Sequence, residues 1–129
     1  RLTGEHLNAQ NLANLAYAPV TLQEEISGTN IRVFVAGEKV LACEVASTEI
    51  DFRDDGAPRI SPQELPPALV DQSQQIAQAL DLIWAGIDYR LTPAGEYYFL
   101  EANPSPMFLG FEDQTGLPLT EALARLLTD

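Results

Sequence analysis

Two pairs of strand-like segments, each joined by a short turn, constrain the fold more than any other feature of this sequence. Residues 31–35 are β-branched or aromatic at most positions, a composition typical of a strand. A glycine-containing turn follows, and residues 40–46 then return as a second strand. Residues 85–92 and 97–103 form another such pair around a turn at 93–96. The sequence therefore predicts two antiparallel hairpins.

The rest of the chain predicts a few helices around these hairpins. Apolar residues between Leu69 and Ile83 fall on one helical stripe opposite a glutamine-rich face, which indicates an amphipathic helix lying on a sheet. A short helix capped by Thr3 or Asn8 is predicted within residues 1–17, and a C-terminal helix capped by Thr120 is predicted at 120–127. Residues 21–26 are predicted to form a strand, and residues 47–62 and 104–118 are predicted to form loops. Residues 61–64 have the spacing of a capping box at a helix start. We therefore expect an α+β fold with five or six antiparallel strands in one domain over residues 1–129.

The charge and the scarcity of two residue types exclude several function classes. The sequence has seven basic and nineteen acidic residues, for a net charge of −12, and the basic residues are scattered along it. This pattern argues against a nucleic-acid groove and against an anionic membrane surface. The single cysteine, Cys43, and the single histidine, His6, exclude an internal disulfide, a cysteine-built zinc site and histidine-rich metal sites. With no long apolar run and no signal peptide, a cytoplasmic location is predicted.

The second hairpin carries the most informative polar residues. If the turn is 93–96, each cross-strand pair sums to 189, so Asp88 faces Glu101 and Arg90 faces Phe99. Asn103 then lies opposite Gly86. Because side chains alternate along a strand, Asp88, Glu101, Asn103 and Arg90 are expected to share one face of the sheet.

Two opposed carboxylates destabilise a sheet unless a cation compensates them. Magnesium prefers oxygen ligands and takes one or two carboxylates together with substrate phosphates, so Asp88, Glu101 and the Asn103 amide oxygen suit it. The alternative is that both carboxylates are ordinary solvated residues on an exposed sheet face. A different turn length would also place them on opposite faces.

Several ordered motifs resemble the C-terminal half of an ATP-grasp ligase, and most closely the RimK-like branch with the maturases that modify ribosomal peptides. The resemblance covers residues from about 18 to the end and rests on the segments 22–26, 28–32, 51–53, 86–90, 99–104 and 115–118.

This resemblance implies a set of site residues. Adenine would be contacted, mostly through main-chain groups, by Gln23, Glu24, Glu25 and Ile26, and the ribose would be contacted by Asn30. Phosphates or the substrate carboxylate would be contacted by Arg32, Arg53 and Arg90. Two Mg²⁺ ions would be bound by Asp88, Glu101 and Asn103. The family usually has an aromatic residue where Glu25 stands and an acidic one where Asn30 stands. Arg53 has a simpler alternative, an ion pair with Asp51 or Asp54.

The resemblance also implies an activity. It implies an ATP-dependent carboxylate–amine or carboxylate–hydroxyl ligase acting through an acylphosphate on a small-molecule or peptide carboxylate. The alternatives are a non-catalytic module that binds a nucleotide, a metal or a peptide, and an ATP-grasp kinase.

The family closes its site with a second subdomain that supplies basic residues and a glycine-rich loop over the phosphates. This sequence has one lysine, Lys39, and no such loop. It is therefore expected to be the C-terminal part of a longer enzyme, inactive alone, with residues 1–17 as a lead-in from the missing upstream subdomain.

Overall fold

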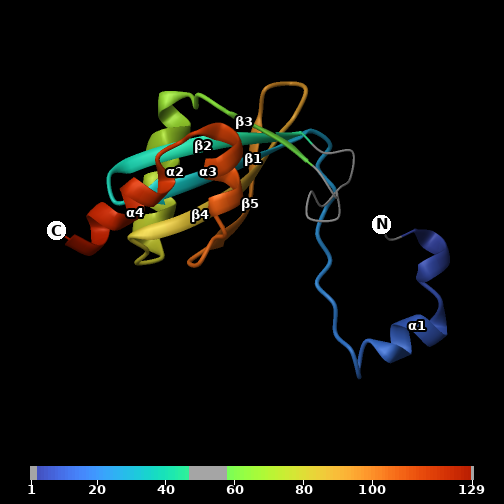
Figure 1. Ribbon diagram of the computed structural model, residues 1–129. Helices are drawn as coiled ribbons and strands as arrows, with labels where there is room; N and C mark the ends of the chain where they lie inside the picture. The colour runs from blue at the N-terminus through green and yellow to red at the C-terminus, as the bar shows by residue number, and fades with distance from the viewer. Residues whose placement is uncertain (1–2, 47–57, 129) are drawn as a thin grey trace.

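The computed structural model describes residues 3–46 and 58–128. Its helices and strands are, in chain order, η1 (Gly4–His6), α1 (Ala9–Asn14), β1 (Thr29–Ala36), β2 (Lys39–Ala46), β3 (Arg59–Pro62), α2 (Pro67–Ala79), β4 (Trp84–Leu91), β5 (Tyr97–Asn103), α3 (Leu109–Thr115) and α4 (Leu119–Thr128). The strands form one antiparallel sheet in the order β3-β2-β1-β4-β5. Helix α2 packs on one face of this sheet, and α3 and α4 pack on the other (Figure 1). The predicted α+β class is therefore confirmed.

Both predicted hairpins are present, and the helix predicted at 69–83 is present in shorter form. Strands β1 and β2 pair from Asn30–Val45 to Ala36–Lys39, and β4 pairs with β5 around the predicted turn. Helix α2 ends at Ala79, because Asp81 takes a left-handed conformation with φ of 56°. The last predicted members of its stripe, Leu80 and Ile83, are consequently exposed.

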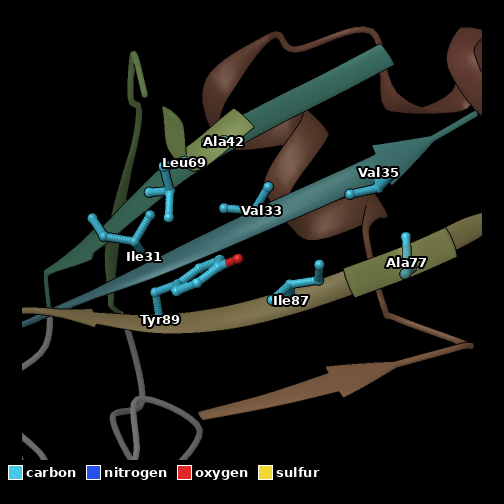
Figure 2. Packing of buried hydrophobic residues seen from close by; sticks show 9 residues of the cluster. Ile31, Val33, Val35, Ala42, Leu69, Ala77, Ile87 and Tyr89 are labelled. Carbon is cyan, nitrogen blue, oxygen red and sulfur yellow. The ribbon is translucent and has the colours of Figure 1, made fainter. Parts of the chain in front are cut away.

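Alternation along the strands builds the core under α2. Ile31, Val33 and Val35 of β1 pack together with Ile87 and Tyr89 of β4 on the side of the sheet that α2 covers (Figure 2). Leu69 and Ala77 meet them from the helix. The buried Ser73 hydroxyl donates to the Leu69 carbonyl oxygen (2.8 Å) and lies 2.9 Å from the Tyr89 hydroxyl, so the polar end of the buried tyrosine has a partner.

A second cluster lies under α3 and α4. Phe34 packs edge to face against Phe111 of α3, with ring centroids 5.3 Å apart, and stacks on Trp84. Cys43 and Leu119 are fully buried in the same cluster. The burial of Cys43 raises the pKa of its thiol to about 11, as suits a small core residue.

Several segment predictions were wrong. Residues 21–26 are not a strand but a segment, exposed except for the half-buried Ile26, that leads from α1 to β1 (Figure 1). The predicted loop 47–62 contains the edge strand β3, which pairs with β2, and its remaining residues up to 57 lie outside the described residues. The predicted loop 104–118 contains α3, a helix of seven residues.

Two predicted helix starts also differ. Ser61 belongs to β3, and α2 begins at Pro67 without a capping box, because a proline at the first helical position needs no capped N–H. At α4 the carboxylate of Glu112 accepts the Thr120 N–H (3.2 Å), so α3 caps α4 in place of the Thr120 side chain.

The N-terminal segment carries the predicted caps. Thr3 precedes η1, and the Asn8 side chain accepts the Asn11 N–H (2.9 Å) at the start of α1. Every residue from 3 to 25 is exposed, and the segment swings away from the sheet (Figure 1). Among the described residues, no helix combines the length and the apolar character that a membrane span requires.

Candidate functional site

The pairing of β4 with β5 contains a bulge that decides which residues meet. Near the turn, each residue of β4 pairs with the β5 residue one position before the predicted partner. Leu91 therefore lies opposite Tyr97, and Arg90 lies opposite Tyr98. The expected partnership of Arg90 with Phe99 is therefore wrong. Leu100 is the extra residue of the bulge, and beyond it the register shifts by one. Asp88 consequently faces Glu101, as predicted.

The bulge also changes the face on which the residues before Leu100 lie. Phe99 lies opposite Tyr89 and packs edge to face on its ring, 6.1 Å away, on the α2 side of the sheet. Glu101 and Asn103 lie beyond the bulge, opposite Asp88 and Gly86, on the side that α3 and α4 cover in part. The three predicted metal ligands therefore share one face, which we call the carboxylate face.

Strand β1 adds two further residues to the carboxylate face. Arg32 lies opposite Asp88, and Asn30 lies opposite Arg90. This pairing joins segments more than 50 residues apart in the sequence. The hairpin arithmetic did not include β1, so the proximity of Arg32 to Asp88 was missed.

Arg32 and Asp88 form a buried ion pair. The Arg32 Nε lies 2.5 Å from Asp88 Oδ1, and Nη2 donates to Oδ2 at 2.9 Å, so the guanidinium contacts both carboxylate oxygens. Arg32 is 7% exposed and Asp88 8%. Burial raises the pKa of Asp88 to about 6, with a further increase from the neighbouring Glu101 and an opposing decrease from Arg32.

Glu101 and Asn103 sit nearer to solvent on the edge strand. Glu101 is exposed and Asn103 half-buried. The Asn103 Oδ1 accepts the Ser105 N–H at 2.8 Å, which fixes its side chain at the start of the loop to α3. An amide oxygen has a second lone pair, so this hydrogen bond leaves it able to bind a cation.

The donor set fits a hard cation and not a soft one. Within residues 3–46 and 58–128, no group of three or more His, Cys, Asp and Glu side chains is placed to hold a metal ion. Two carboxylates with one amide oxygen match magnesium, which fills its remaining positions with water and phosphate. An all-protein cage of the zinc or calcium type needs more ligands than this face supplies.

The other predicted site residues lie at one end of this face or outside it. Arg90 is half-buried, and its Nη1 donates to the Gly28 carbonyl oxygen (3.3 Å), which fastens the entry of β1 to β4. Gln23, Glu24 and Glu25 are exposed and Ile26 is half-buried, all in the segment before β1. Arg53 lies outside the described residues.

Comparison with known proteins identifies the family. The RimK-like ATP-grasp domain matches residues 8–127, which is nearly the whole chain. The chain belongs to the RimK-like ATP-grasp family. A probable alpha-L-glutamate ligase 2 from Shewanella amazonensis is 32% identical to this ATP-grasp chain over 121 residues, which cover 85% of the chain and 38% of that relative. A probable alpha-L-glutamate ligase 1 from Shewanella oneidensis is 31% identical, with the same coverage.

Solved ATP-grasp ligases have the same fold. PsnB, complexed with a phosphomimetic variant of its minimal precursor, Mg and ADP, superposes with a TM-score of 0.84 at 32% identity over 98% of this chain. A RiPP-associated ATP-grasp ligase from Chryseobacterium gregarium, in complex with ADP and a leader and core peptide, gives 0.87 at 27% identity over the full chain. The macrocyclase MdnC from Microcystis aeruginosa, bound with precursor peptide MdnA, gives 0.83 at 29% identity over 98% of the chain.

The chain accounts for 41% of each of these three solved chains and 38% of the curated relatives named above. It therefore spans about two-fifths of the length of the ATP-grasp proteins that it matches.

Proposed function

We propose that this chain is the Mg·ATP-binding part of a ligase that activates a carboxylate as an acylphosphate and joins it to an amine or a hydroxyl. The observation that carries the proposal is the carboxylate face, where the Leu100 bulge brings Glu101 and Asn103 onto the face of Asp88. The relatives named above support it, since they are ligases and one is solved with Mg and ADP.

Three side chains hold the metal in this proposal. Asp88 and Glu101 would offer carboxylate oxygens, and Asn103 its amide oxygen, to one or two Mg²⁺ ions. When bound, Mg²⁺ neutralises the β- and γ-phosphate oxygens and orients the group that is transferred. The Ser105 N–H keeps the Asn103 oxygen directed, because it donates to that oxygen at 2.8 Å.

The nucleotide base and ribose lie toward the entry of β1 in this proposal. Main-chain groups of residues 23–26 contact the adenine, and Asn30 contacts the ribose. Arg90 brings positive charge to the same end of the sheet, next to Asn30. We assign Arg90 to the phosphates or to the substrate carboxylate, and Arg53 to the same group of contacts.

The reaction needs no side-chain nucleophile. A substrate carboxylate oxygen attacks the γ-phosphorus and ADP leaves, and an amine or hydroxyl then attacks the acyl carbon and displaces phosphate as its proton departs. The chain contributes positioning and charge neutralisation. This suits a protein whose only cysteine is buried and whose only histidine lies on the exposed N-terminal segment.

We further propose that the acceptor or donor is a peptide and that residues outside this sequence complete the phosphate cradle. PsnB, MdnC and the Chryseobacterium enzyme are each solved with peptides, which supports the first part. The single lysine of this chain supports the second part, because an ATP phosphate tail carries several charges to be neutralised.

The binding step is tested by calorimetric titration of the chain with AMPPNP, in Mg²⁺ and in EDTA. We expect weak binding that requires Mg²⁺ and is lost in Glu101→Gln. The matched control is Glu96→Gln, which removes one carboxylate from the turn of the same hairpin and should bind as the wild type does. Equal binding in Mg²⁺ and EDTA would remove the metal from the proposal.

The chemical step is tested by product analysis. ATP and candidate peptides are incubated with the 129-residue chain and with a polypeptide that carries it together with the rest of an ATP-grasp enzyme. We expect ADP release only with the longer polypeptide and only when the carboxylate substrate is present, together with a product whose mass is that of the joined donor and acceptor less one water. A phosphorylated product that persists would assign a kinase. Turnover by the chain alone would show that its phosphate site is already complete.

A further inference from the structure

Arg32 lies in a slot formed by three residues from separate parts of the chain. An added Cβ on Gly86 would lie 3.1 Å from the Arg32 Nη1 and 2.6 Å from the Pro106 side chain, so the missing side chain of Gly86 makes room for both. The Phe111 ring of α3 lies under the guanidinium, with its centroid 5.6 Å from the Arg32 Cζ. The guanidinium is thus enclosed on the same face that carries the proposed metal ligands.

The enclosed position limits what Arg32 can contact. Its side chain is 8% exposed, and the guanidinium grips both oxygens of Asp88. Asp88 occupies the Nε and Nη2 edge of the guanidinium, and Nη1 lies against Gly86, so little room is left for the direct phosphate contact that the family resemblance implies. Arg32 instead contacts Asp88, one of the proposed metal ligands.

We propose that Arg32 is a positioning residue for Asp88: its guanidinium orients the carboxylate and balances its charge beside Glu101 until a divalent cation takes over that charge. The inference rests on the proposed function, because it assumes that Asp88 and Glu101 bind the cation. In this proposal Arg32 does not bind phosphate directly but acts by orienting one metal ligand, Asp88.

The charges explain why such a residue is useful. Asp88 is buried beside a second carboxylate, an arrangement that is costly without a nearby positive charge. A fixed guanidinium keeps the two carboxylates together before the metal arrives. It also repels the incoming cation, so it weakens the binding of the metal.

Two kinds of Arg32 variant separate charge from shape. Arg32→Gln removes the charge and keeps a hydrogen-bonding side chain, whereas Arg32→Lys keeps the charge and loses the planar fork. Arg125→Gln is the matched control, because it removes one positive charge from an exposed ion pair with Glu121 on α4. The probe is Mn²⁺ as a spectroscopic substitute for Mg²⁺, followed by electron paramagnetic resonance, together with thermal melts with and without Mn²⁺, all with ADP present.

We expect Arg32→Gln to bind Mn²⁺ about tenfold more tightly than the wild type, since a repelling charge next to the cation is gone. Its melting temperature without metal should fall by about 10 °C, and saturating Mn²⁺ should restore most of the loss. Arg32→Lys should bind Mn²⁺ within about twofold of the wild type, because the charge remains. Arg125→Gln should change neither measurement.

Failure of the inference is distinguishable from failure of the proposed function. If the wild type binds Mn²⁺ and Arg32→Gln binds it no more tightly, the inference fails and the metal site stands. An Arg32→Gln chain that is destabilised or unfolded and is not rescued by Mn²⁺ also overturns it, because Arg32 is then merely structural. No Mn²⁺ binding by the wild type, or binding unchanged in Glu101→Gln, would overturn the proposed metal site and the inference with it.

Discussion

The two faces of the sheet are built from the same strands but differ in the polarity of the side chains that they bury. In β1, Ile31, Val33 and Val35 pack under α2, whereas the alternate positions Asn30 and Arg32 join the carboxylate face. The α2 face is apolar, and the buried Ser73 and Tyr89 hydroxyls lie 2.9 Å apart and satisfy each other there. The carboxylate face keeps a buried charged pair beside an exposed carboxylate. The comparison shows that both faces bury apolar side chains, and that the carboxylate face also carries an electrostatic cost that a cation can relieve.

The largest effect is expected from a substitution that changes only the carboxylate face. Glu101→Gln removes one proposed metal ligand at an exposed position, so the fold should survive. We expect Mg²⁺-dependent turnover in the longer polypeptide to fall at least about a hundredfold, since even residues that only support a metal ligand cost 10–100-fold when mutated. Steady-state assays over a range of Mg²⁺ concentrations measure this. Normal activity in Glu101→Gln, with Glu96→Gln as the control, would show that the carboxylates are structural.

A core truncation breaks the α2 face alone. Ile87→Ala empties a fully buried position next to Tyr89. We expect the free energy of unfolding to fall by about 2–5 kcal/mol, because the cavity adds to the lost burial. Urea titration followed by circular dichroism measures it. At temperatures where the variant stays folded, the Mg²⁺ dependence of nucleotide binding should match the wild type. A changed Mg²⁺ dependence would mean that the two faces are not independent.

The pH dependence of stability sharpens the comparison, because it should come from the carboxylate face. The pKa of Asp88 is about 6 in the folded protein, against an ordinary value of 3.8. The folded state therefore holds this proton more tightly than the unfolded state. The resulting stabilisation is complete below pH 4 and is lost as the pH rises through 6.

Wild type and Asp88→Asn should be compared in EDTA across this pH range. Their difference in unfolding free energy should change by up to about 3 kcal/mol, with the wild type losing stability as the pH rises. The opposing Arg32 pair and the neighbouring Glu101 both contribute to the net shift. A difference that is flat between pH 4 and 7 would contradict the raised pKa.

Local sequence signals predicted the parts of the fold that depend on local contacts. The hairpins were predictable because turn residues separate strand-forming runs in both. Strand β3 was missed because it is four residues long and ends in a proline, and it becomes a strand only by pairing with β2. Helix α3 was missed because it is short, and packing of Phe111 against Phe34 stabilises it.

The site illustrates the same limit. The pairing of Asp88 with Glu101 was predicted from an incorrect register, and it holds because the Leu100 bulge compensates for the longer turn. The sequence carries no local signal for that bulge. The Arg32–Asp88 pair depends on β1 lying beside β4, a contact that no hairpin rule supplies. Gly86 was the available clue, since a glycine two residues before Asp88 leaves space on the same face.

The smallest effect is expected for an ion pair that belongs to neither face. Its loss of unfolding free energy is the reference against which the buried pair is compared. Arg125 and Glu121 form an ion pair one helical turn apart on α4, with side chains 72% and 55% exposed. Solvent screens such a pair, so Arg125→Ala should change the free energy of unfolding by less than about 0.5 kcal/mol. The same measurement on Arg32→Gln should give a loss several times larger, because the same kind of ion pair is buried there. Urea titrations of both variants at low and high salt provide the comparison. Equal losses would mean that burial does not strengthen the Arg32–Asp88 pair, and the distinction between this face and ordinary surface would fail.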